Sequence, residues 1–94
     1  MSNLLDGNCC VNVIGKLKSE QEVITYNGGF LWDTISCWEN LLPVEAMDLF
    51  ENVESNYSSI FNNLDHYTEL EFQLWDDDAG SDALLVSNVE LNAN

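Results

Sequence analysis

Basic residues are almost missing from this sequence. It contains no arginine and two lysines, Lys16 and Lys18, so no basic residue occurs from Ser19 to Asn94. Proteins that bind nucleic acid use Lys and Arg to displace the counterions of the phosphates, and basic residues also attract proteins to anionic membranes. We therefore expect this chain to bind neither DNA nor RNA directly, and to have no affinity for an anionic membrane.

Long apolar runs and paired cysteines are also missing. No run approaches the roughly 20 residues that a membrane-spanning helix needs, and Met1 to Gly7 lack the basic and apolar regions of a secretory signal. The three cysteines, Cys9, Cys10 and Cys37, show no metal-binding spacing. Adjacent cysteines on a strand point to opposite faces and do not pair easily. We expect free thiols and a cytoplasmic location, the cytosol of a bacterial host.

Catalytic motifs are absent as well. The sequence has no glycine-rich phosphate loop, no HExxH motif and no serine nucleophile elbow. Its single histidine, His66, follows a helical segment, which is typical of a capping or surface residue. The cysteines have no basic neighbours that would favour a thiolate. The sequence predicts that the protein is not an enzyme and needs no cofactor.

The remaining composition is that of a folded domain. Hydrophobic residues make up 46% of the 94 residues and aromatic residues 11%, which is too rich for a disordered tail. A chain of this length forms one domain. We expect a single acidic domain over residues 1–94, with fraying at 1–7 and 92–94.

Alternating apolar and polar residues predict four strands. Residues 9–17 alternate, and the β-forming residues 22–26 complete a hairpin with them. The same alternation returns over residues 69–74. After an acidic turn, residues 83–91 supply a last strand that pairs back as a second hairpin.

Apolar residues at helical spacing predict two helices between the hairpins. One covers residues 31–42, and the other begins near Pro43 and extends to Leu64. Poor helix formers at 55–59 predict a kink there. The chain is thus predicted to be a small α+β domain of ββ-αα-ββ order, with a mostly antiparallel sheet and the helices on one face.

The net charge is the most unusual property of the chain. There are 17 Asp and Glu residues, which give a formal net charge of −15. Ordinary solubility needs a charge magnitude of only about 2 to 8, and an excess of like charge destabilises a compact fold by self-repulsion. The imbalance therefore favours a function in which the protein binds a basic partner.

The spacing of the carboxylates indicates where that partner binds. On the second predicted helix they recur every three residues and rise about 4.5 Å per step, and Glu69 and Glu71 lie about 6–7 Å apart on one strand face. Consecutive phosphates of a nucleic-acid strand are several ångströms apart, so such rows can occupy the phosphate positions of a basic groove. The predicted partner-binding residues are Glu45, Asp48, Glu51, Glu54, Glu69, Glu71, Trp75, Asp76, Asp77 and Asp78.

The turn from Asp76 to Asp82 is rich in aspartate, and Trp75 directly precedes it. The aspartates of the turn offer hard oxygen ligands that suit Ca²⁺ or Mg²⁺, but Gly80 does not fit the register of a calcium loop. We predict an acidic hairpin tip without a metal site. Trp75 shares a strand face with Glu71 and adjoins the aspartates, and a tryptophan ringed by acid is suited to anchor an interface.

In its size, its charge and its scarcity of enzyme motifs, the sequence resembles the small acidic inhibitors made by phages and mobile elements. These include DNA-mimic anti-restriction and anti-CRISPR proteins. The resemblance is to a class and not to one family's motif. It implies a stoichiometric inhibitor that presents a nucleic-acid-like carboxylate surface to a basic groove of a CRISPR effector or restriction nuclease, as a monomer or a homodimer. Separately, Leu31-Trp32-Asp33 followed by Trp38 is similar to a helix segment of barstar-type ribonuclease inhibitors.

Two other functions remain open at this point. A toxin-neutralising immunity protein that caps the active site of a basic toxin would have the same acidic character. An acidic adaptor or a metal-binding module is the third possibility. All but the metal-binding module act by binding a partner protein, so sequence features alone do not separate them.

Overall fold

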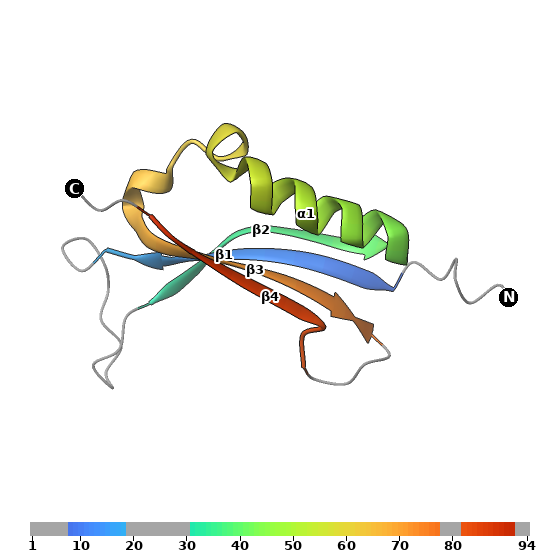
Figure 1. Cartoon of the computed structure of the whole chain (residues 1–94). Helices are drawn as coiled ribbons and strands as arrows, with labels where there is room; N and C mark the ends of the chain where they lie inside the picture. Colours follow the sequence, from blue (N-terminus) through green and yellow to red (C-terminus); the bar gives the residue numbers. More distant parts are fainter. Residues whose placement is uncertain (1–7, 19–30, 78–81, 92–94) are drawn as a thin grey trace, which may run out of the picture.

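The computed structural model describes residues 8–18, 31–77 and 82–91, and these form one sheet with a helix across it (Figure 1). Neighbouring strands in the sheet are antiparallel and follow the order β2-β1-β3-β4. The predicted α+β class with an antiparallel sheet is confirmed. The elements are β1 Cys9–Leu17, β2 Trp32–Leu41, α1 Pro43–Ile60, the 3₁₀ turn η2 Leu64–His66, β3 Tyr67–Asp76 and β4 Leu85–Glu90.

The core lies between α1 and one face of the sheet. Helix α1 contacts the two central strands, β1 and β3 (Figure 1). Alternate residues of these strands point toward the helix, which is the expected period of two. The buried residues of this core are Cys9, Val11, Val13, Ala46, Phe50, Val53, Leu70, Phe72 and Leu74.

The predicted helix over residues 31–42 is wrong, because these residues form the edge strand β2. Their apolar residues do recur at helical spacing, yet the segment is rich in β-branched and aromatic residues, which favour strands. Two register shifts against β1 break the alternation along β2. The strand period is therefore hidden in the sequence. The segment that resembles a barstar helix, Leu31 to Trp38, lies largely in this strand.

The second predicted helix is confirmed as α1, with a shorter extent. Pro43 occupies its first turn, as predicted, and the backbone leaves helical geometry at Asn56 (φ −125°, ψ 22°), inside the predicted kink. The Asn56 side chain donates to the backbone oxygen of Asn52 at 3.1 Å, and such local bonds compete with helix geometry. Helix α1 ends at Ile60, so among residues 8–18, 31–77 and 82–91 the element order is ββ-α-ββ, with one α-helix where two were predicted.

The predicted strands at 9–17, 69–74 and 83–91 are confirmed as β1, β3 and β4, and β3 pairs with β4 in the predicted second hairpin. The predicted strand at 22–26 lies outside the described residues, as do the ends at 1–7 and 92–94. Within the described part of the chain, the strand that follows β1 and pairs with it is β2.

Gly15 of β1 lies directly beneath the ring of Tyr67. A Cβ at this position would stand 2.6 Å from Tyr67 Cδ1 and 3.0 Å from Ile35 Cδ1, and the ring cannot easily yield because Tyr67 is only 4% exposed. We expect Gly15→Ala to lower the free energy of unfolding by about 1–3 kcal/mol, as overpacking does. Urea denaturation measures the loss. Thr34→Ala, an exposed change on β2, is the control, and an unchanged urea midpoint for Gly15→Ala would contradict the close packing.

The Tyr67 hydroxyl donates a hydrogen bond of 2.9 Å to Asp33 Oδ2. Burial, followed by this hydrogen bond and the Asp33 charge, raises the pKa of Tyr67 from 10.0 to about 12. Because the folded pKa lies above the unfolded one, the contribution of this group to stability is fully present below pH 10 and is lost as the pH rises toward about 12. Ultraviolet titration of the tyrosines should show one late transition. Tyr67→Phe should abolish that transition, and its persistence would assign it to another tyrosine.

Candidate partner-binding surface

The face of the sheet opposite α1 is polar and is covered by no described helix or strand. We call it the open sheet face. Its members follow from the strand register, which places Asn12 beside Gln73, Ile14 beside Glu71 and Lys16 beside Glu69. It comprises Cys10, Asn12, Ile14, Lys16, Trp32, Thr34, Cys37, Glu39, Glu69, Glu71, Gln73, Trp75, Val86, Asn88 and Glu90.

The predicted partner-binding residues divide between two sides of the molecule. Glu69, Glu71 and Trp75 lie on the open sheet face, whereas the four helix carboxylates lie on α1, which covers the other face (Figure 1). The carboxylates of α1 and those of β3 therefore do not form the one continuous surface that was predicted, but lie on opposite sides of the sheet. Asp76 and Asp77 lie at the end of β3, and Asp78 is outside the described residues.

Three carboxylates gather on the open sheet face. Glu69 stands directly opposite Glu90 in the β3–β4 register, and Glu71 is the next residue along β3 on the same face. Asn88 Nδ2 donates to Glu69 Oε2 at 2.9 Å and to Glu71 Oε1 at 3.2 Å. Like charges opposite one another destabilise a sheet. Asn88, and Lys16 on the other side of Glu69, offset part of that cost. We call Glu69, Glu71 and Glu90 the carboxylate cluster.

A chain of hydrogen bonds extends from the carboxylate cluster to Trp75. Gln73 Nε2 donates to Glu71 Oε2 at 2.7 Å, and Trp75 Nε1 donates to Gln73 Oε1 at 3.0 Å. Asn12 Nδ2 lies 3.5 Å from the same Gln73 oxygen. The indole is thus half-buried and oriented along the open sheet face. The amide chain that fixes Glu71 was not foreseen, although the alternation of Glu71, Gln73 and Trp75 places all three on one face.

The helix carboxylates have more structural roles than their spacing predicted. Glu45 Oε1 accepts the backbone N–H of Leu42 at 3.0 Å, which satisfies a donor at the start of α1. Glu54 Oε2 accepts a 2.6 Å hydrogen bond from Ser87 Oγ and so ties α1 to β4. Asp48 and Glu51 are exposed. Half of the predicted helix row therefore contributes to the fold.

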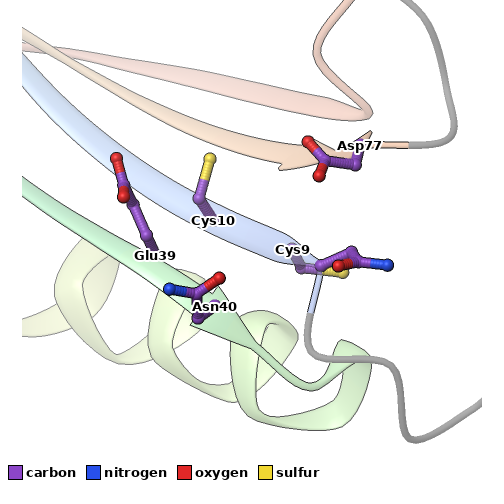
Figure 2. Close-up of a pocket in the computed structure, with 6 residues that line it drawn as sticks. Cys9, Cys10, Glu39, Asn40 and Asp77 are labelled. Atoms are coloured by element: carbon purple, nitrogen blue, oxygen red, sulfur yellow. The ribbon is translucent and has the colours of Figure 1, made fainter.

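A small pocket of about 240 Å³ lies at one end of the sheet. Asn40, one of its lining residues, has a positive φ of 58°, a conformation that asparagine tolerates better than most residues. Figure 2 shows the Cys10 thiol and the Glu39 carboxylate side by side on neighbouring strands, with Asp77 at the end of β3. The pocket is lined by Asn8, Cys9, Cys10, Glu39, Asn40 and Asp77. Sequence reasoning missed it, because the backbone turn at Asn40 has no clear sequence signal.

The thiols of this region are poorly suited to nucleophilic chemistry. Burial, then the nearby Cys37, Glu39 and Asp77, raises the pKa of the Cys10 thiol. Burial and Glu39 raise the pKa of Cys37 in the same direction. Since the thiolate is the reactive form, the raised pKa lowers the thiolate fraction of both groups. All three cysteines are free thiols in the structure.

Metal ligands do not converge in the described part of the chain. Among residues 8–18, 31–77 and 82–91, no group of three His, Cys, Asp or Glu side chains is placed to hold a metal ion. The acidic turn that the sequence singled out lies partly outside these ranges, since Asp78 and Gly80 are not described. The absence of a metal site at the turn remains a prediction.

The described segments also contain no helix that is long and apolar enough to cross a membrane. Comparison with known proteins adds no relative to these observations: no family model, no curated protein and no solved structure matches the chain.

Proposed function

We propose that this protein is a stoichiometric inhibitor that uses its open sheet face to occupy a basic groove of a nucleic-acid-binding protein. The target class is that of a CRISPR effector or a restriction nuclease in the bacterial cytosol. The carboxylates take the positions of phosphates, and the chain itself binds no nucleic acid.

The carboxylate cluster is the observation that carries this proposal. Glu69 of β3 and Glu90 of β4 stand opposite each other on neighbouring strands, and Glu71 is the next residue of β3 on the same face. This arrangement costs the isolated protein stability. Lysine and arginine side chains of a partner would turn the repulsion into attraction. The amide groups of Asn88 and Gln73 hold Glu69 and Glu71 in place before binding, which lowers the entropy lost when a partner docks.

The overall charge supports the same conclusion. A chain of net charge −15 accelerates its encounter with a basic protein and makes the association sensitive to salt. The open sheet face contributes Trp75 and Trp32 beside the carboxylates, and aromatic side chains of this kind supply much of the binding energy in interfaces.

A pull-down from host lysate tests the proposal. The immobilised protein should retain a basic nucleic-acid-binding protein at low salt and release it at high salt. Added nucleic acid should compete with the immobilised protein for its target. Retention of a secreted toxin instead would identify an immunity protein, and a partner whose binding ignores salt and nucleic acid would contradict the mimicry.

A further inference from the structure

The outer edge of β4 has unused backbone hydrogen-bonding groups. Strand β4 is last in the sheet order, and no described strand pairs with its outer side (Figure 1). The Leu91 N–H donates to the Thr68 oxygen at 3.0 Å. The backbone groups of Leu91 therefore point inward, toward β3. Along an antiparallel strand, residues whose backbone groups point inward alternate with residues whose groups point outward. Val86, Asn88 and Glu90 therefore direct their N–H and C=O groups outward.

Most of this edge is also apolar, and its one charged residue, Glu90, is the last of β4. Leu84, Leu85 and Val86 are 51%, 39% and 52% exposed, and no charged residue occurs from Ala83 to Val89. An exposed strand edge with these properties readily pairs with another strand.

The opposite edge of the sheet, β2, differs from β4 in the regularity of its backbone and in its charge. It pairs with β1 through two register shifts, and it carries the carboxylates Asp33 and Glu39. Irregular backbone and charge are features that discourage strand addition. Of the two edges that the described residues form, β4 is the one suited to accept a strand.

The surroundings of β4 define the chemistry of such a strand. On the open sheet face, an added strand would lie directly beside Val86, Asn88 and Glu90, with Glu69 and Glu71 one strand further in, on β3. On the helix face, β4 presents Leu85, Ser87 and Val89. An added strand would thus have one carboxylate beside it and two more one strand away on one of its faces, and mainly apolar side chains on the other.

We propose that the outer edge of β4 accepts an extended segment in which basic and apolar residues alternate, as an additional strand of the sheet. This inference rests on the proposed function, since it names how the basic partner is held. Main-chain hydrogen bonds to Val86, Asn88 and Glu90 supply affinity, and the alternation supplies specificity. A second copy of the chain is disfavoured as the occupant, because each copy carries a net charge of −15.

A labelled synthetic peptide of four Lys-Val repeats is the probe, and a peptide of four Lys-Pro repeats is its charge-matched reference that cannot pair. Fluorescence anisotropy should show at least about tenfold tighter binding of the Lys-Val peptide. Amide exchange at Val86, Asn88 and Glu90 should slow when it binds. Val86→Pro removes one outward donor and no bond to β3, so it should abolish the preference between the peptides.

Two further variants distinguish the loss of the backbone donor from a loss of folding. Val86→Thr keeps the backbone donor and should bind as the wild type does, whereas Val86→Lys should repel the probe without affecting the backbone. Circular dichroism checks that each variant is folded. Equal affinity for both peptides, or exchange protection at β2 instead, would overturn the proposal. A dimer in analytical ultracentrifugation that Val86→Pro dissociates would assign the edge to a second copy.

The proposed function can fail separately. If the peptide does not pair with β4 but a basic partner is still recovered from lysate, only the strand addition is wrong. If the peptide pairs but no nucleic-acid-binding protein is recovered, the edge is functional and the inhibitor proposal is wrong.

Discussion

Replacing Phe72 by alanine should lower the free energy of unfolding by about 3–5 kcal/mol. Phe72 is fully buried at the centre of β3, and its ring centroid lies 5.9 Å from that of Tyr57 on α1. Truncation removes this contact and leaves a cavity between helix and sheet, so both transfer and cavity terms oppose the fold. A domain of this size has only about 5–15 kcal/mol of stability in total.

Thermal and urea unfolding measure the effect. At roughly 4–8 °C per kcal/mol for a small domain, the melting temperature should fall by more than about 12 °C. Val86→Ala is the matched control, since Val86 is 52% exposed on the edge strand, and it should change stability by no more than about 0.5 kcal/mol. A loss below about 1 kcal/mol for Phe72→Ala would show that α1 does not pack on β3 as described.

Reversing two charges of the open sheet face should weaken partner binding by roughly a hundredfold or more. Each close opposite-charge contact across an interface contributes about 1.5 kcal/mol or more, so Glu69→Lys with Glu71→Lys removes about 3 kcal/mol, which corresponds to a factor of about one hundred. The same change replaces the repulsion from Glu90 by attraction, but it also places a positive charge opposite Lys16. Circular dichroism must therefore show that the variant is folded. Binding of the wild type should weaken as salt is added.

The matched control reverses two charges on the other side of the molecule. Asp48→Lys with Glu51→Lys makes the same change in net charge at exposed positions on α1. This variant should lose only the long-range part of the attraction, at most about tenfold in affinity at physiological salt. The dissociation constant of each variant for the partner identified from lysate is the measurement. If the helix variant loses more affinity than the sheet variant, α1 and not the open sheet face is the contact.

These experiments depend on a division that the sequence does not show. The helix carboxylates recur every three residues and the strand carboxylates every two, and both spacings place neighbouring carboxylates several ångströms apart. The sheet separates them, because α1 packs against the face that carries Phe72 while alternation turns Glu71 to the other face. Lys16 lies opposite Glu69 in the register, so it belongs to the same face as the carboxylate cluster. Only the fold reveals which charges act together.

The local sequence was sufficient for the regular elements. Alternation at β1, broken only by Ile14, and at β3, together with apolar residues at helical spacing after Pro43, predicted those elements correctly, because each buries one side against the same core. The poor helix formers around Asn56 correctly predicted the break in α1. The excess of carboxylates, and with it the expectation of a basic partner, also follows from composition alone.

The tertiary structure decided the rest. Residues 31–42 follow a helical pattern, yet residues 32–41 form β2, because pairing with β1 satisfies their backbone N–H and C=O groups. Two register shifts against β1 hide the strand period in the sequence. Register placed Glu69 opposite Glu90 although 21 positions separate them in the chain. It also left β4 at an edge with its outward groups unpaired within the described sheet. Such long-range pairing depends on which strands meet, and that is determined by the packing of the whole core and not by any single segment.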